Sequence, residues 1–380
     1  MENFIVSARK YRPGTFDTVV GQSHVTNTLK NAIKNNHLAQ AFLFCGPRGV
    51  GKTTCARILA KTINCQNLQE GIEPCNECES CKAFNESHSF NIYELDAASN
   101  NSVDDIRALV DQVRYAPQGA KYKIYIIDEV HMLSSAAFNA FLKTLEEPPS
   151  YAIFILATTE RHKILPTILS RCQIFDFKRI QIPDIAKHLQ KIAEKEGIVA
   201  DPLALHIVSE KADGALRDAL SIFDQMVSFS GNHLTYDSVI ENLNILDYDY
   251  YFKVTDAINA ENVPLALNLY DEILQKGFDG LVFLEGLSLH IRNLLVCKDT
   301  GTLKLLQVAD NVKEKYKTQA IATDTGLLFN ALSIATHAEV GYKASRNQRL
   351  HVELALIKMC LIPQAISIEA GNDALKKKMM

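Results

Sequence analysis

The sequence lacks several features that would assign it to a special class of protein. No apolar run approaches the roughly 20 residues that a membrane-spanning helix needs. The opening residues, MENFIVSARKYRPGTF, are interrupted by charge too soon to form a secretory signal. There is no internal repeat and no low-complexity tract. We therefore expect a cytoplasmic protein that does not interact with membranes.

No strong excess of charge of either sign is present. The 380 residues carry a formal net charge of −4 at pH 7. This argues against a nonspecific coat on nucleic acid but is compatible with a local basic surface. Hydrophobic residues make up 47% and charged residues 22%, which excludes wholesale disorder. At about 100–200 residues per domain, we expect two or three domains, each with its own core.

The nine cysteines form two groups with different predicted roles. Five occur singly in apolar or helical stretches, and we interpret them as small core residues: Cys45, Cys55, Cys172, Cys297 and Cys360. The other four lie together in the segment 65–81, at Cys65, Cys75, Cys78 and Cys81. In a cytosolic chain, such crowding indicates a metal site rather than disulfides.

The spacing Cys75-x-x-Cys78-x-x-Cys81, with Cys65 upstream, suits a tetrahedral zinc ion, because C-x-x-C turns direct two sulfurs at one point. The inserted segment is too polar to pack by itself, so a metal would replace its missing core. An iron–sulfur cluster is the alternative, since it accepts the same spacing. No further redox motif accompanies it, and four protein ligands leave no open position. We expect a structural zinc site.

Four short β-rich segments are predicted to form one sheet. They cover residues 41–45, 123–127, 151–157 and 172–177. Amphipathic segments lie between them, including one that follows residue 51 and one that begins at a serine and ends at Pro148-Pro149. Strands that alternate with helices predict an α/β fold with a parallel sheet and helices on both faces.

No strand is predicted after about Lys178, and the rest of the chain has helical periodicity. Three short helices are expected between Pro183 and about Asn242, and longer apolar helices between Tyr248 and Pro363. These patterns divide the chain into domains at 1–178, 179–242 and 243–363, with a tail at 364–380.

The segment GPRGVGKT fits the pattern G-x-x-x-x-G-K-[ST], which cradles phosphates and is called a P-loop. The predicted nucleotide-binding residues here are Gly46, Pro47, Arg48, Gly49, Val50, Gly51, Lys52, Thr53 and Thr54. It follows a predicted strand and opens a predicted helix, whose N-terminus adds a positive field. Lys52 would contact the β- and γ-phosphates, and the Thr53 hydroxyl would ligate Mg²⁺.

Two further strand ends carry polar side chains. Asp128 and Glu129 follow the strand 123–127, where Asp128 can bind Mg²⁺ and Glu129 can polarise the attacking water. A solvated strand end with two acids is the alternative. Thr158 and Thr159 end the strand 151–157, and a hydroxyl there, assigned to Thr158, can lie between the γ-phosphate and the water.

The chain resembles the gamma/tau subunits of bacterial DNA polymerase III clamp loaders, a family of AAA+ ATPases. The resemblance covers about Ser7 to Asp224 and weakens to a helical pattern beyond. It rests on motifs in family order: ARKYRP, VVGQ, GPRGVGKT, C…CxxCxxC, IYIIDEVHML, FNAFLKTLEEPP, LATTE, ILSRC and GALRDAL. It implies a P-loop AAA+ ATPase domain with an inserted zinc knuckle, then a three-helix lid and an all-α oligomerisation collar.

The resemblance also implies roles for single residues. Arg171 of ILSRC would be an arginine finger that reaches the γ-phosphate of a neighbouring subunit. Leu216 and Arg217 of GALRDAL would form the second sensor, which ties the lid to its own nucleotide. The segment that cradles the adenosine would include Tyr11, Arg12, Pro13 and Val20.

For DNA, the family tracks the phosphate backbone along the inside of a spiral of ATPase domains. The resemblance places Arg107, Lys143 and Thr167 on that surface. Asn100 and Ser102 stand where some relatives have basic residues, and neutral side chains provide no counterion-release contribution to phosphate binding.

The function implied is that of an ATP-hydrolysing motor, with ATP, Mg²⁺ and Zn²⁺, that opens a sliding clamp and loads it onto primed DNA. Implied partners are the clamp, the primed DNA, other clamp-loader subunits, further copies of the chain in a ring, and the polymerase core through a region not identified in these residues. A nucleotide-binding scaffold that needs no hydrolysis is the alternative. A small-substrate kinase is disfavoured by the helical rear half, and no polymerase active site is found.

Overall fold

The computed structural model describes residues 5–86, 88–243, 246–306, 308 and 310–364. The chain forms two compact units, Met1–Thr235 and Tyr236–Met380, which are described separately. Most of the predicted tail, residues 365–380, lies outside the described residues. None of the described helices combines the length and the apolar character that a membrane span requires.

The first unit is built on a five-stranded parallel sheet with strand order β2-β3-β4-β1-β5. The strands are β1 (Ala41–Cys45), β2 (Ile92–Asp96), β3 (Lys123–Asp128), β4 (Ala152–Thr158) and β5 (Gln173–Asp176). The parallel sheet is confirmed, but strand β2 was not predicted. It lies at an edge of the sheet, where Glu94 and Asp96 are exposed, so its sequence has no continuous apolar run.

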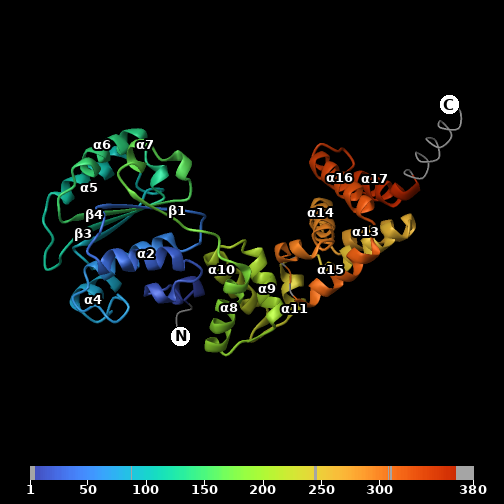
Figure 1. The fold of residues 1–380 in the computed structure, drawn as a ribbon, viewed down its shortest axis with the longest axis horizontal. Helices are drawn as coiled ribbons and strands as arrows, with labels where there is room; N and C mark the ends of the chain where they lie inside the picture. The colour runs from blue at the N-terminus through green and yellow to red at the C-terminus, as the bar shows by residue number, and fades with distance from the viewer. Residues whose placement is uncertain (1–4, 87, 244–245, 307, 309, 365–380) are drawn as a thin grey trace. The chain divides into compact units, whose positions relative to one another are not determined.

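Alternate side chains of the central strands enter separate cores on the two faces of the sheet. Phe42 and Phe44 of β1 pack with one face, which is covered by α2 (Ser23–Lys34), α3 (Lys52–Ile63) and α4 (Glu79–Asn85). Leu43 faces the other core, with α5 (Val103–Val113), α6 (Ser135–Glu146) and α7 (Pro166–Leu169). Figure 1 shows the two helical layers on opposite sides of the strands.

Three helices complete the first unit, as the sequence predicted: α8 (Ile182–Glu196), α9 (Pro202–Lys211) and α10 (Leu216–Ser230). A pair of two-residue strands, β6 (Val199–Ala200) and β7 (His233–Leu234), was not predicted, because two residues carry no periodic signal. The N-terminal helix α1 (Ser7–Lys10) packs on α10, and the Ser7 amide donates a hydrogen bond of 2.7 Å to Asp224.

The second unit is helical throughout its described residues. Its helices are α11 (Tyr236–Asn242), α12 (Tyr248–Asn259), α13 (Val263–Gln275), α14 (Gly280–Val296), α15 (Asp310–Ala322), α16 (Thr325–Tyr342) and α17 (Gln348–Cys360), with a 3₁₀ segment at Thr300–Leu305. Helices α12 to α17 share one apolar core that includes Phe283, Leu287 and Leu356. Helix α11 belongs to this unit, whereas the sequence pattern extended the lid to Asn242.

Candidate nucleotide-binding site

The P-loop connects β1 to α3 at the carboxyl edge of the sheet. Gly46 has a φ of +148°, and a Cβ there would lie 2.4 Å from the carbonyl oxygen of Phe177. Gly51, with a φ of +102°, is the N-cap of α3. Both positions therefore require glycine. The turn leaves the first amides of α3 directed at the loop, which is the arrangement that binds phosphate.

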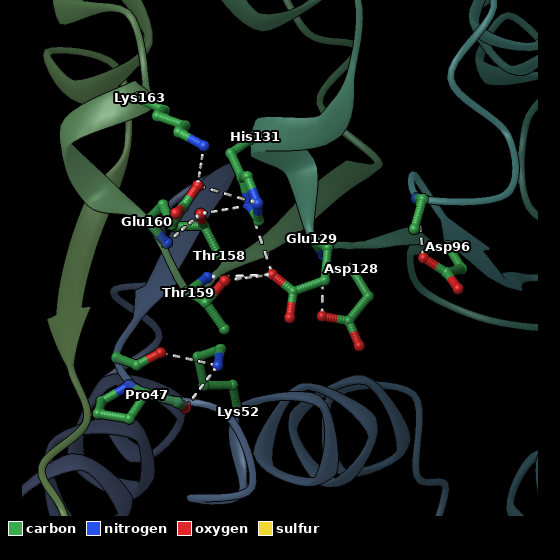
Figure 2. Close-up of polar contacts among 12 residues, drawn as sticks. Pro47, Lys52, Asp96, Asp128, Glu129, His131, Thr158, Thr159, Glu160 and Lys163 are labelled. Carbon is green, nitrogen blue, oxygen red and sulfur yellow. Dashed lines mark hydrogen bonds and ion pairs between the residues drawn. The ribbon is translucent and has the colours of Figure 1, made fainter. Parts of the chain in front are cut away.

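Lys52 is the first residue of α3 and is only 5% exposed. Its ammonium donates hydrogen bonds of 2.8 Å to the carbonyl oxygens of Gly46 and Pro47, as Figure 2 shows. Burial lowers the pKa of Lys52, and the carboxylates of Glu129 and Asp128 oppose this shift. The lysine charge is therefore held inside the loop, where anionic oxygens would replace the lost hydration.

The two predicted Mg²⁺ ligands contact each other. The Thr53 hydroxyl donates a hydrogen bond of 2.5 Å to Asp128 Oδ2, although the residues are 75 positions apart. The other Asp128 oxygen accepts the backbone amide of Glu129 at 3.0 Å. A hydroxyl and a carboxylate are the oxygen donors that Mg²⁺ prefers, so these residues fit the ion.

Glu129 directs its carboxylate from the end of β3 toward the end of β4. Its φ of +47° is unusual for a non-glycine residue and sets this direction. Glu129 Oε2 accepts hydrogen bonds from the amide and the hydroxyl of Thr159, at 3.1 and 3.0 Å. Thr158, the residue assigned from the sequence, is fully buried, and its Oγ1 lies 3.1 Å from His131 Nδ1. Thr159 is therefore the threonine beside Glu129, because successive strand residues point in opposite directions.

The N-terminal segment joins the P-loop helix to the lid. Tyr11 donates a hydrogen bond from its hydroxyl to Glu196 of α8, and Arg12 Nε lies 3.4 Å from Thr54 Oγ1 in α3. Pro13 and Val20 are half-buried in the same segment. Tyr11 and Arg12 thus connect this segment to both sides of the P-loop.

Gln22 is a further residue of this region, and its sequence pattern gives no indication of a role. Its side chain is fully buried, donates to the carbonyl oxygens of Lys178 at 2.7 Å and Val50 at 3.4 Å, and accepts the Lys178 amide at 3.3 Å. It therefore joins the P-loop to the chain that leads into the lid. The motif VVGQ contained this residue, but only its burial indicates the role.

The lid touches the P-loop through its backbone. The amide of Arg217 donates to the carbonyl oxygen of Gly49 at 3.3 Å. A Cβ on Gly49 would lie 2.9 Å from the Cβ of Ala215, so glycine permits this close approach. The Arg217 side chain is exposed beside the loop, and Leu216 is half-buried. The predicted second sensor is therefore adjacent to the phosphate loop of its own chain.

Arg171 lies near the amino ends of the parallel strands, opposite the carboxyl ends that carry the P-loop. It lies two residues before β5, whose residues Gln173–Asp176 run parallel to Phe42–Cys45 of β1. Four residues of strand span about 13 Å, so Arg171 is far from the P-loop of its own chain. Its guanidinium forms an ion pair of 2.8 Å with Glu146 at the end of α6 and donates to the Thr167 carbonyl at 2.6 Å.

The three predicted DNA-contacting residues come from the helices of one face of the sheet. Arg107, Lys143 and Thr167 lie on α5, α6 and α7, and all three are exposed. Arg107 forms a 3.3 Å ion pair with Asp104 in its own helix. Ser102 is the N-cap of α5, where its hydroxyl accepts the Asp105 amide. The Ser102 side chain therefore stabilises a helix end.

The four clustered cysteines converge in space. Their Sγ atoms all lie within 4.8 Å of one another, from Cys65, Cys75, Cys78 and Cys81. A tetrahedral zinc ion with Zn–S bonds of about 2.3 Å would hold sulfurs about 3.8 Å apart, so the cluster fits the ion closely. The amides of Glu77 and Cys78 donate to Cys75 Sγ at 3.5 and 3.2 Å and help to lower the Cys75 pKa to about 6. This favours the thiolate form of Cys75, whereas burial raises the pKa of Cys65 and of Cys81 in the metal-free cluster.

Buried charged groups attach the cysteine segment to the rest of the domain. Glu73, only 7% exposed, accepts the amides of Phe16 and Asp17 at 2.8 and 3.0 Å and pairs with Lys30 at 2.7 Å. On α3, the buried Lys61 donates to Asn76 at 2.5 Å. The insertion is therefore part of the domain, held to α2 and α3.

Comparison with known proteins places the chain in a family. The DNA polymerase III subunit tau of Bacillus subtilis is 42% identical over 372 residues, which are 98% of this chain and 66% of the relative. The DNA polymerase III subunit gamma of Buchnera aphidicola is 41% identical over 266 residues, 70% of this chain and 72% of the relative. The chain belongs to the DNA polymerase III gamma/tau family. This confirms the resemblance seen in the motifs.

Two family descriptions match successive parts of this gamma/tau chain. "DNA polymerase III, delta subunit" matches residues 21–181, and "DNA polymerase III clamp loader subunit, ATPase lid domain" matches residues 184–232. The chain spans 40% to 66% of the length of five tau or gamma/tau relatives, including 55% of the Escherichia coli subunit tau, to which it is 38% identical. A solved structure of RuvB T158V from Thermotoga maritima aligns with 65% of this chain and 79% of the RuvB chain, at 20% sequence identity and a TM-score of 0.47.

Proposed function

We propose that this gamma/tau chain binds ATP with Mg²⁺ and hydrolyses it as a motor subunit of a clamp loader. The subunit would act in the cytoplasm during DNA replication. The observation that supports this best is the convergence of Lys52, Thr53, Asp128 and Glu129 at the carboxyl edge of one parallel sheet. A scaffold that only bound nucleotide would need no carboxylate aimed beside the P-loop, whereas hydrolysis does.

Each of these residues has a separate role in the proposed reaction. The amides at the start of α3 and the Lys52 ammonium bind phosphate oxygens. Thr53 and Asp128 would hold Mg²⁺, which when bound neutralises charge on the β- and γ-phosphates. Glu129 accepts a proton from the attacking water, and Thr159 holds the carboxylate in place.

The residues around the P-loop would recognise the rest of the nucleotide. Tyr11, Arg12, Pro13 and Val20 would cradle the adenosine. From the lid, Arg217 would contact the phosphates of its own subunit, so that lid and nucleotide move together. The hydrogen bond between the Arg217 amide and Gly49 supports this coupling.

The proposed partners are further clamp-loader subunits, copies of this chain, a sliding clamp and primed DNA. The apolar helical second unit would form the oligomerisation collar. The exposed residues Arg107, Lys143 and Thr167 would contact DNA phosphates, which provides affinity without sequence readout. Arg171 would act on the nucleotide of a neighbouring subunit.

The test of this function is ATPase activity of the assembled complex with and without the clamp and primed DNA. A motor subunit should turn over slowly alone and be stimulated strongly when both are present. Binding of ATP without stimulated hydrolysis would instead identify a scaffold. A mutant clamp unable to close its ring, together with unprimed DNA, provides the controls.

We also propose that the cysteine cluster holds a structural zinc ion. Purified protein should contain about one equivalent of zinc, and iron in its place would indicate a cluster. Cys78→Ser should lower the stability of the first unit by about 2 kcal/mol or more, which corresponds to a fall in Tm of roughly 4–8 °C. Cys297→Ser, at a half-buried cysteine of the second unit, is the control. Loss of turnover in a well-folded Cys78→Ser protein would contradict a purely structural role.

A further inference from the structure

His131 occupies an unusual position between two carboxylates. It lies in the 3₁₀ turn Val130–Met132 after β3, and its side chain is only 8% exposed. Its Nδ1 is 3.4 Å from Glu129 Oε2, and its Nε2 is 3.4 Å from Glu160 Oε2. Figure 2 shows the ring between the two acidic side chains. Neither the P-loop nor the Mg²⁺ ligands account for this arrangement.

The ring is held by residues at the end of β4. Thr158 Oγ1 lies 3.1 Å from His131 Nδ1 and accepts the Glu160 amide at 3.0 Å. Lys163 forms an ion pair with Glu160, which lowers the pKa of that carboxylate and keeps it charged beside Nε2. Thr158 is therefore the hydrogen-bonding partner of Nδ1, and the Glu160 carboxylate lies against Nε2, so the buried ring has little freedom to rotate.

The contacts of the Glu129 carboxylate with Thr159 and His131 are all made by one of its oxygens, Oε2. Both groups of Thr159 donate to Oε2, and His131 Nδ1 approaches the same atom. Contacts concentrated on one carboxylate oxygen set the plane of the group and the direction of the other oxygen. A general base must present its accepting oxygen within hydrogen-bond reach of the proton that it removes.

We propose that His131 is a positioning residue that holds Glu129 in the orientation required for hydrolysis, an inference that rests on the proposed ATPase function. Within the described residues, His131 contacts Glu129, Thr158 and Glu160 and no residue of the P-loop, so its effect is on turnover and not on binding. It also links Glu129 to the segment Thr158–Lys163. A displacement of that segment would change the direction of the Glu129 carboxylate.

The alternative is a purely structural role, in which the partly buried His131 stabilises the fold through its contacts with neighbouring side chains. That role predicts a loss of stability, with little change in turnover per folded molecule. A positioning role predicts a change in kcat that depends on Glu129 being present. The two roles are therefore separated by kinetics in two backgrounds.

The experiment compares three substitutions at His131 in the assembled complex. An asparagine amide falls near the position of Nδ1, and a glutamine amide falls near that of Nε2. His131→Phe should lower kcat by about tenfold or more, with KM for ATP and ATP binding changed less than about twofold. His131→Asn should retain more activity than His131→Gln, because the contact with Glu129 is made by Nδ1. His162→Phe, at an exposed histidine in the neighbouring turn, is the matched control and should behave as the wild type.

The second part repeats His131→Phe in the Glu129→Gln protein, with single-turnover assays to detect slow hydrolysis. No further loss is expected there, because the group that His131 positions has already been changed. The proposal would be overturned if His131→Phe lowered kcat equally in the wild-type and Glu129→Gln backgrounds, or left kcat unchanged in the wild-type background. Higher activity of His131→Gln than of His131→Asn would also overturn it. Absence of hydrolysis in the wild-type complex would overturn the ATPase function itself and this inference with it.

Discussion

Glu129→Gln should lower the rate of ATP hydrolysis by about 10²–10⁴-fold and leave ATP binding nearly unchanged. The substitution keeps the size of the side chain and its hydrogen-bonding oxygen, so the contacts with Thr159 can persist. It removes the negative charge that accepts a proton from water. Lys52 and the amides of the P-loop bind the phosphates and are not altered.

The measurement pairs steady-state turnover with equilibrium binding of a fluorescent ATP analogue. Lys52→Ala serves as the opposite case, because it removes the buried ammonium and should abolish most of the binding as well as turnover. Glu147→Gln, at an exposed glutamate after α6, is the matched control for the loss of one carboxylate. If the Glu129→Gln protein turned over at the wild-type rate, Glu129 could not be the general base.

The parts of this site that the sequence predicts are those encoded by short contiguous strings. The loop from Gly46 to Thr53 has a conformation set by its own glycines, and Asp128 ends an apolar strand whose carboxyl end a parallel sheet places at the same edge as the loop. Because the carboxyl ends of parallel strands share one edge, the pairing of Thr53 with Asp128 follows from these local signals.

The parts that could not be predicted depend on side-chain direction and on burial. Whether Thr158 or Thr159 faces Glu129 is decided by the pleat of β4, which a one-residue shift would reverse. Gln22 and Glu73 have polar side chains whose importance appears only when they are seen buried with paired backbone groups. The edge strand β2 carries exposed acids and therefore gives a weak strand signal.

The role of Arg171 is partly predictable. The motif ILSRC indicates an arginine finger only by family resemblance, because a single arginine forms no pattern of spaced residues that could indicate a function. The structure adds that Arg171 lies at the amino edge of the sheet, opposite the P-loop. It also adds the ion pair with Glu146, which no local pattern indicates.

Arg171→Ala should leave ATP binding intact and lower hydrolysis in the assembled ring by about 10³–10⁵-fold where the finger is fully engaged. The reason is that the guanidinium stabilises charge on the transferring phosphoryl group of a neighbouring subunit. Arg171→Lys should recover only part of the rate, because an ammonium keeps the charge but lacks the planar fork. ATP binding is measured on the same preparations, since Lys52 of each subunit is unchanged.

Mixing two inactive proteins distinguishes action in trans from action in cis. In a mixed ring, an Arg171→Ala subunit has an intact P-loop and can receive Arg171 from a Lys52→Ala neighbour. The position of Arg171, about 13 Å of strand away from its own phosphate loop, favours this arrangement. Partial recovery of ATPase activity on mixing is therefore expected, at a level set by the fraction of correctly paired interfaces. No recovery in rings shown by mass spectrometry to contain both proteins would mean that Arg171 does not act across the interface.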